Sequence, residues 1–427
     1  MRPATKAVSV AVLLFSSMAS GQGGGDRWLP TWVASPQQPR TPGPGGPAGF
    51  SGTFNNQTVR MIVHSSIGGR RVRVQLSNAY GSAPLVVGSL HVALRIKDSR
   101  IAPDTDRALM FNGMSSCTIP VGAFLISDPV DLEVPKQADL AVSVYVPGDS
   151  GVATAHSTGL HTTWISKSGN VTGKPEIADA VTTESWYWIS GVEVLAPPAA
   201  ASLVAFGDSI TDGFRSTPNT DGSWPAFFAT RLLTNPATTE IAVLNEGITG
   251  NRLLRDGAGV SALARFDRDV LSQAGAKWIM LLEGINDIGA GIGPDLVVGP
   301  KPATDIVTVD ELAGAYKQII ERAHEHGIKV FGSPLLPFEG AVYYTDSGNA
   351  TRLAINKWIR TSGAFDGLVD FEAAVRDTAN PNRIRPEFDA GDHLHPNNAG
   401  YKAMAEAIDL SLFVSRGTAV SRSRTKR

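Results

Sequence analysis

The chain has 427 residues, of which 42% are hydrophobic and 18% charged; this is the balance of a globular protein with room for two or three domains. A formal net charge of -2 gives no electrostatic case for binding nucleic acid or an anionic membrane surface. Cys117 is the only cysteine, which excludes an intramolecular disulfide and a zinc site built from cysteines.

The first twenty residues have the order of a secretory signal peptide. A basic start at Arg2 and Lys6 precedes an apolar run over 7–15, and small residues follow over 16–20. The apolar run is too short to span a bilayer. We therefore predict a signal peptide over 1–20 and a secreted protein, extracellular or periplasmic, without stable membrane insertion.

Alternating strands are predicted next. Residues 21–52 form a segment whose Gly and Pro run over 37–47 cannot hold a helix or a central strand. From residue 53 on, apolar and polar residues alternate, most clearly over 59–64, 71–76 and 140–146. Alternation bounded by turn residues is typical of antiparallel strands. We predict an all-β sandwich or jelly-roll domain over 53–197.

A different pattern follows an Ala- and Pro-rich linker at 194–201. Apolar runs typical of buried parallel strands alternate with amphipathic stretches typical of helices. The predicted strands are 202–206, 278–282, 329–333 and 367–371, and the predicted helices are 223–234, 309–326, 350–362 and 397–412. This alternation predicts an α/β domain over 202–414 with a parallel sheet covered on both faces. The basic end, 415–427, predicts a disordered tail.

Ser209 directly follows the first of these strands, in the triplet Gly207-Asp208-Ser209. Ligands of α/β folds bind at the carboxyl ends of parallel strands. A serine becomes a good nucleophile when a base removes its proton, and Asp392 and His395 lie close enough in sequence for one turn to supply a carboxylate and a base. Alone, the triplet is a weak signal, since Ser209 is equally suited to be a helix N-cap.

Four short blocks resemble those of the SGNH/GDSL hydrolase superfamily, in the same order. They are residues 206–213, 245–250, 284–287 and 392–396, with Ile210 where the name-giving motif has leucine. The resemblance extends from about Leu203 to Phe413, and the region before it is similar, more diffusely, to the N-terminal β domain of some secreted esterases of the superfamily.

This resemblance implies a flavodoxin-like three-layer fold and ester hydrolysis. Ser209 would be the nucleophile, His395 the base and Asp392 its orienting carboxylate. The N–H groups of Ser209, Gly250 and Asn286 would form the oxyanion hole. His393 is the competitor for the role of base, although the spacing in the family favours His395.

Other polar residues near these blocks have structural interpretations. We expect Asp208 and Asp287 to accept hydrogen bonds from loop backbone. Asp212 and Arg252 are suited to line the pocket or to form an ion pair, and Glu283 is similarly ambiguous. The histidines of the β domain, His64, His91, His156 and His161, are dispersed along the chain, so we expect no metal site. No Walker loop or dinucleotide fingerprint is present, and no cofactor is expected.

The expected function is that of a secreted serine ester hydrolase acting on a small-molecule or polysaccharide ester. Secretion and an accessory β domain favour short acyl groups, such as O-acetyl groups on carbohydrate. The alternatives are a lipase or lysophospholipase, an acyltransferase, or a non-catalytic carbohydrate-binding protein on a hydrolase scaffold. Five tryptophans of the β domain are suited to stack on sugars or to fill its core, namely Trp28, Trp32, Trp164, Trp186 and Trp188.

Overall fold

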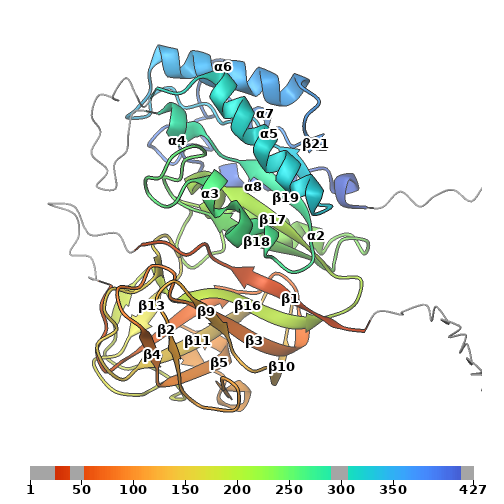
Figure 1. The fold of residues 1–427 in the computed structure, drawn as a ribbon. Coiled ribbons are helices and arrows are strands. Elements are labelled where there is room, and N and C mark those ends of the chain that lie inside the picture. Colours follow the sequence, from red (N-terminus) through yellow and green to blue (C-terminus); the bar gives the residue numbers. More distant parts are fainter. Residues whose placement is uncertain (1–24, 39–51, 290–305, 415–427) are drawn as a thin grey trace, which may run out of the picture.

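The computed structural model describes residues 25–38, 52–289 and 306–414. The predicted signal peptide, the predicted tail and most of the Gly/Pro-rich run lie outside the described residues. Figure 1 shows a β region (25–38 and 52–196) lying against an α/β region (201–289 and 306–414). Within these ranges, no helix has the length and apolar character needed to cross a membrane.

Two antiparallel sheets make up most of the β region, which confirms that this region consists mainly of strands. The first sheet contains β1 (Arg27–Val33), β16 (Ile189–Ala196), β3 (Gly69–Ser77), β10 (Val130–Val134) and β9 (Phe124–Ile126). The second contains β14 (Val181–Thr183), β13 (Thr163–Ile165), β2 (Gln57–His64), β11 (Asp139–Val146), β5 (Ser89–Lys97), β6 (Arg100–Ile101) and β7 (Arg107–Leu109). Two short pairs complete it, β12 (Ala155–His156) with β15 (Trp186–Tyr187) and β4 (Leu85–Val87) with β8 (Cys117–Ile119).

Strand β3 shows why this sequence forms sheets. Val72, Val74 and Leu76 are buried, whereas Arg73 and Gln75 between them are half-buried. Successive side chains of a strand point to opposite faces, so this alternation buries one face of the strand. The more specific expectation of a sandwich or jelly roll stays a prediction.

The β region begins earlier than predicted, which is a correction to the boundary at residue 53. Strand β1 pairs with β16 along its length, and Leu29 and Val33 belong to the core. Pro30 interrupts the alternation, and the register shifts between Pro30 and Trp32. Proline is tolerated at sheet edges and bulges, and β1 is the edge strand of its sheet. A short strand containing proline, followed by a Gly/Pro run, has no recognisable period.

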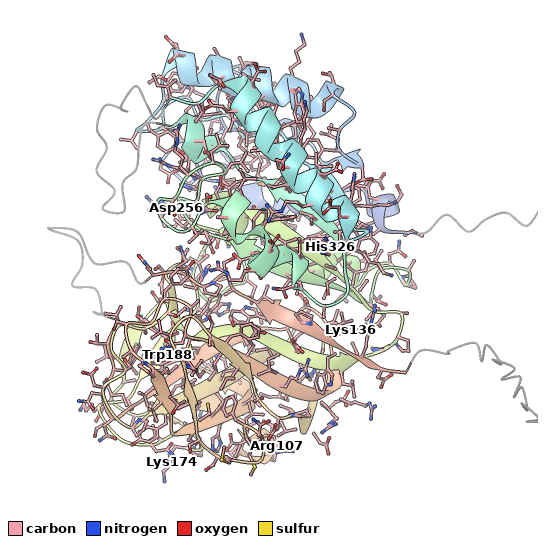
Figure 2. The ribbon with its side chains drawn as sticks, in the orientation of Figure 1. Arg107, Lys136, Lys174, Trp188, Asp256 and His326 are labelled. Carbon is pink, nitrogen blue, oxygen red and sulfur yellow. The ribbon has the colours of Figure 1, made fainter. Side chains whose placement is uncertain are left out.

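The predicted linker is also shorter than expected. Strand β16 continues to Ala196, and β17 (Ala201–Gly207) begins five residues later. Strand β1 lies between the two regions and contacts both β17 and β18. Lys136, labelled in Figure 2, crosses the boundary as well: its Nζ donates to the Thr239 carbonyl at 2.8 Å and pairs with the Glu240 carboxylate at 2.5 Å. The two regions are therefore joined by side-chain contacts as well as by the chain.

The α/β region contains a parallel sheet, which confirms the α/β class. Its strands are β18 (Ile241–Gly247), β17, β19 (Ala276–Leu282), β20 (Lys329–Gly332) and β21 (Gly367–Leu368), in that spatial order. Numbered along this region, the order is 2-1-3-4-5, which is typical of flavodoxin-like folds. All seven residues of β17 are buried, as expected of a central parallel strand.

The helices of this region largely follow the predicted positions. They are α1 (Ser209–Asp212), α2 (Trp224–Leu232), α3 (Ala262–Phe266), α4 (Ile285–Ile288), α5 (Val309–Glu325), α6 (Asp346–Thr361), α7 (Phe371–Val375) and α8 (Asn398–Glu406). A capping box begins α5: Glu311 N donates to Thr308 Oγ1 at 3.2 Å, and Thr308 N donates to the Glu311 carboxylate at 2.8 Å.

Several elements differ from prediction. Helices α1, α3, α4 and α7 were not predicted, and α6 begins four residues before its predicted start. Helix α8 ends six residues before the predicted end, and a 3-10 turn over Leu410–Phe413 follows it. The predicted strand 367–371 is shorter, because Phe371 begins α7 after Asp370 caps the Ala373 N–H at 2.9 Å. Strand β18 was not predicted, because Asn245 and Glu246 end its apolar run after four residues.

Candidate active site

A sharp turn places Ser209 at the carboxyl edge of the parallel sheet. Strand β17 ends at Gly207, and the Asp208 side chain caps α1 by accepting from Ile210 N at 2.9 Å. A Cβ on residue 207 would lie 2.2 Å from the Leu282 carbonyl oxygen, so only glycine fits between β17 and β19. Ser209 is therefore the first helical residue after the central strand, where α/β folds place ligands.

The structure brings Ser209, His395 and Asp392 together. Ser209 Oγ lies 2.8 Å from His395 Nε2, and His395 Nδ1 lies 2.9 Å from an Asp392 carboxylate oxygen. The competitor His393 is exposed and pairs with Asp389 at 2.6 Å. In this geometry, Asp392 accepts the Nδ1 proton and leaves Nε2 to accept the proton of the serine hydroxyl.

Asp392 is held as a carboxylate. Burial alone would raise its pKa, but the hydrogen bond and charge of His395, with backbone N–H donors of Leu394 and His395, hold the pKa well below its usual range. Arg215 Nε adds a contact to the same carboxylate at 3.0 Å. The Phe214 ring packs edge-on against the His395 imidazole, with 4.9 Å between ring centroids. The segment after α1 therefore contacts both the base and its carboxylate.

The two other predicted oxyanion donors follow the ends of strands β18 and β19. Gly250 has φ +80°, a left-handed conformation that favours glycine. Asn286, in α4, donates from Nδ2 to the Asn251 carbonyl at 2.8 Å, and Tyr343 donates its hydroxyl to Asn286 Oδ1 at 3.4 Å. An amide nitrogen carries two hydrogens, so the bond to Asn251 leaves a second one for an oxyanion.

Three acidic residues in or next to the blocks that contain Ser209 and Asn286 are deeply buried, namely Asp208, Glu283 and Asp287. Burial raises the pKa of Asp208 to about 7, with the Ile210 N–H acting against this and the Asp287 charge adding to it. Asp287 accepts from Leu253 N at 2.6 Å and Leu254 N at 3.0 Å, so it holds loop backbone as expected. Burial likewise holds the pKa of Glu283 well above its usual range. Asp208 therefore fixes the turn that carries Ser209, and Asp287 fixes the loop after Gly250.

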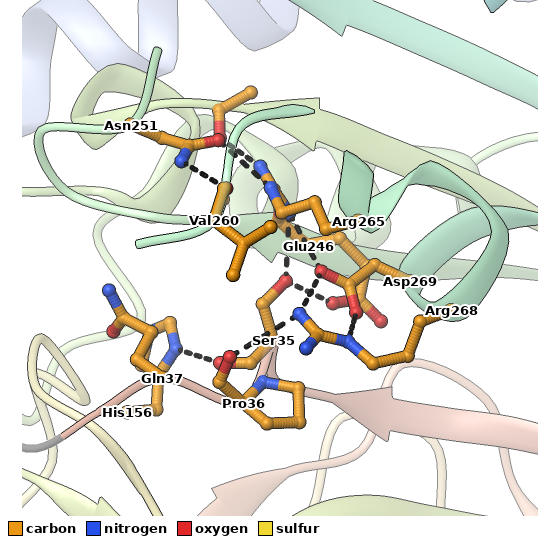
Figure 3. A network of polar contacts seen from close by, with 12 residues as sticks. Ser35, Pro36, Gln37, His156, Glu246, Asn251, Val260, Arg265, Arg268 and Asp269 are labelled. Atoms are coloured by element: carbon orange, nitrogen blue, oxygen red, sulfur yellow. Dashed lines mark hydrogen bonds and ion pairs between the residues drawn. The ribbon is translucent and has the colours of Figure 1, made fainter. Parts of the chain in front are cut away.

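Arg265 in α3 is a residue that the sequence analysis missed. Its guanidinium is buried and contacts Ser35, Gly207, Glu246, Asn251 and Asp269 (Figure 3). It donates to the Gly207 carbonyl at 2.9 Å and to Asn251 Oδ1 at 2.9 Å. One side chain therefore connects the end of the nucleophile strand with the loop after Gly250. The only signal in the sequence is an arginine inside an apolar stretch, which is typical of a buried, paired charge.

Three of the four histidines that are dispersed along the β region converge in space. His64, His156 and His161 line one cavity of about 100 Å³ between the two regions. His64 Nδ1 lies 2.8 Å from Asp139 and 3.4 Å from Asp221, a set of ligand atoms close enough to hold a metal ion. Arg95 and His161 already pair with these carboxylates, at 2.8 and 2.9 Å. We therefore interpret the cluster as an ion-pair network between the regions.

The tryptophans of the β region are mainly packing residues. Trp186 and Trp188 are buried, and the Trp32 ring packs edge-on against Trp186 with 4.8 Å between centroids. Trp28 and Trp164 are half-buried and covered by arginines, Arg73 and Arg95 respectively. These contacts agree with a structural role.

Comparison with known proteins adds an independent finding. Residues 205–403 match the model of the GDSL-like lipase/acylhydrolase family. No curated protein matches the chain significantly.

Two solved structures illustrate the similarity. A catalytic mutant of an acetylxylan esterase from Geobacillus stearothermophilus is 25% identical, over 50% of this chain and 94% of that one, with a TM-score of 0.37. A GDSL-like lipase from Bacteroides thetaiotaomicron is 20% identical, over 49% of this chain and 87% of that one, with a TM-score of 0.36. The family match and the geometry around Ser209 lead to one conclusion: residues 205–403 form a GDSL-like lipase/acylhydrolase domain, and the protein is an ester hydrolase.

Proposed function

We propose that the protein is a secreted serine esterase that removes short acyl groups, such as O-acetyl groups on carbohydrate, through an acyl-enzyme. The observation that carries this proposal is the continuous contact from Ser209 Oγ through the His395 ring to Asp392, at 2.8 and 2.9 Å. Both side-chain contacts have the length and direction that a nucleophile, a base and an orienting carboxylate need.

In the proposed reaction, Ser209 Oγ attacks the acyl carbonyl while His395 Nε2 takes its proton. His395 then returns the proton to the leaving alcohol, and Asp392 stabilises the imidazolium in between. The N–H groups of Ser209, Gly250 and Asn286 stabilise the negative charge on the carbonyl oxygen. Water, activated by the same imidazole, releases the acyl group and restores the serine.

Crowding around the serine favours a small acyl group. Ser209 and His395 are 3% and 7% exposed. Phe214 packs against the imidazole on one side. Tyr343, whose hydroxyl donates to Asn286 Oδ1, packs so closely on Gly289 that a Cβ there would lie 2.7 Å from the ring. A long acyl chain needs an apolar channel, whereas an acetyl group needs a space of a few atoms. The predicted signal peptide and the β region add support for a polymeric substrate outside the cell.

The test is hydrolysis of p-nitrophenyl esters from acetate to palmitate, together with acetate release from acetylated xylan. Ser209→Ala should lose activity by on the order of 10³-fold or more and keep the thermal melt of the wild type. Ser411→Ala, which changes an exposed serine, is the matched control and should keep full activity.

The ester series separates the possible outcomes. Fast acetate cleavage that declines with chain length and disappears in Ser209→Ala would support the proposal. A preference for palmitate would replace it with a lipase. Full activity in a clean preparation of Ser209→Ala would remove Ser209 from the reaction.

A further inference from the structure

The segment that follows the nucleophile has two sides. On one side, Phe214 and Arg215 contact His395 and Asp392, as described above. On the other, the same segment contacts the β region. Leu160 accepts from Asn219 N at 2.8 Å, and Thr162 N donates to Asn219 Oδ1 at 2.8 Å. One short segment therefore contacts both the catalytic residues and the β region.

His156 of β12 contacts the helix that begins with the serine. Its Nε2 lies 3.0 Å from an oxygen of Asp212, the last residue of α1, and both side chains are only 4% exposed. The second oxygen of Asp212 accepts two bonds from Thr249, from the backbone N at 2.8 Å and from Oγ1 at 2.7 Å. Thr249 immediately precedes Gly250. Two successive contacts, from His156 to Asp212 and from Asp212 to Thr249, and one peptide bond thus lead from the β region to the proposed oxyanion donor.

The backbone at the end of β18 packs closely against the backbone at the end of α1. A Cβ on Gly247 would lie 2.2 Å from Asp212 N and 2.6 Å from Asp212 Cα, so the end of β18 and the end of α1 touch directly. A displacement of Asp212 is therefore passed to the loop that carries Gly250. An oxyanion donor has to lie within a few tenths of an ångström of its position to act on the transition state.

His156 is itself held from both sides. Its Nδ1 lies 3.0 Å from the Ser35 carbonyl, which only accepts, and its Nε2 faces the Asp212 carboxylate. The Ser35 carbonyl fixes one ring nitrogen and the Asp212 carboxylate the other, so the imidazole plane is held at both ends. Figure 3 shows His156 and Ser35 next to the Arg265 network. Removing the ring would leave a buried oxygen of Asp212 without this hydrogen-bond partner.

We propose that His156 is a positioning residue of the esterase: it holds Asp212, Asp212 holds the Thr249 N–H, and this chain places the Gly250 N–H in the oxyanion hole. The β region would then complete the active site of the α/β region. This inference rests on the proposed function, because it assigns a role in ester hydrolysis.

The test compares His156→Ala and His156→Gln with the wild type in the full-length protein. The glutamine keeps a side-chain N–H donor, whereas the alanine has none. Functional sites are counted by titration with a fluorescent phosphonate that reacts with Ser209, so that kcat is expressed per titrated site. The control is His91→Ala, which removes a histidine of the β region that pairs with Asp106 at 3.0 Å, away from the cavity.

We expect kcat for p-nitrophenyl acetate to fall roughly 10² fold in His156→Ala and roughly tenfold in His156→Gln, with KM nearly unchanged. His91→Ala should keep the kcat of the wild type. A merely structural role would reduce the number of titrated sites and leave kcat per site unchanged.

An unchanged kcat per titrated site in both variants would overturn the inference, as would a rise in KM without a fall in kcat. If His156→Ala does not fold, the kcat of His156→Gln alone decides. Wild-type protein that cleaves no ester would contradict the proposed function instead, so the two failures are distinguishable.

Discussion

The catalytic edge of the parallel sheet and the interface between the two regions are built from different kinds of sequence. Ser209, Gly250, Asn286 and the Asp392–His395 turn come from four short blocks in which neighbouring residues act together. The interface joins side chains far apart in the sequence, such as Ser35 with Glu246 and His156 with Asp212. Chemistry at a strand end leaves a local motif, whereas the contacts that hold it in place leave none.

Asp392→Asn should distinguish the catalytic edge from the interface most strongly. An asparagine keeps the shape but no longer stabilises the imidazolium, so kcat should fall by on the order of 10⁴ fold, with little change in the melting temperature. The measurement is p-nitrophenyl acetate hydrolysis with a thermal melt of the same sample. His393→Ala is the control, because His393 is exposed and should be dispensable; a comparable loss in that variant would reverse the assignment of the base.

Arg265→Met should have the next largest effect, on stability. It would remove the buried guanidinium that pairs with Asp269 and donates to the Gly207 carbonyl and to Asn251 Oδ1, at a cost of about 3–5 kcal/mol in the free energy of unfolding, measured by urea denaturation. Arg322→Met removes a guanidinium whose partner Asp267 is largely exposed, and it should cost less than about 1 kcal/mol. Equal losses in the two variants would show that Arg265 is not the connecting residue described above.

Asn286→Ala should lower kcat by roughly 10²–10³ fold and change KM little, because its bond to the oxyanion is made chiefly in the transition state. Steady-state kinetics with p-nitrophenyl acetate gives both constants. Tyr343→Phe, which removes only the hydroxyl bonded to Asn286 Oδ1, is the milder control. An unchanged kcat in Asn286→Ala would exclude Asn286 from the oxyanion hole.

The smallest effect is expected from His64→Gln, at the interface. Burial lowers the pKa of His64, but the hydrogen bond to Asp139 and the charge of Asp221 raise it above 6.5 overall. The folded state therefore binds this proton more tightly than the unfolded chain. The resulting stabilisation is complete below the unfolded pKa and is lost as the pH rises through the raised one.

Thermal melts at about pH 6 and about pH 8 should therefore show His64→Gln less stable than the wild type by about 1 kcal/mol or less at the lower pH and nearly equal at the higher. A difference that grows with pH would contradict the ion-pair interpretation of the His64 cluster.

The sequence was sufficient to predict that Ser209, Asp392 and His395 meet, and to predict the main strands of the α/β region. Mainly apolar runs predicted β17, β19 and β20, and Thr308 with Glu311 marks the start of α5. The β region was harder, since Pro30 hides β1 and nothing in the neighbourhood of His156 indicates a partner more than fifty residues away. Whether a histidine pairs across two regions depends on its distance from the partner in the folded protein, which no local sequence pattern encodes.

Strand β1 has a consequence for how the protein is made. It is the first described strand, yet its partner in the sheet is β16, more than 150 residues later, and β16 leads almost directly into the nucleophile strand β17. During synthesis, the first sheet cannot close until nearly half of the chain has left the ribosome, and Leu29 remains uncovered until then. Because this edge closes late, the nascent β region exposes apolar surface for longer, which is the condition that favours aggregation during folding. The first sheet is therefore completed shortly before Ser209 emerges.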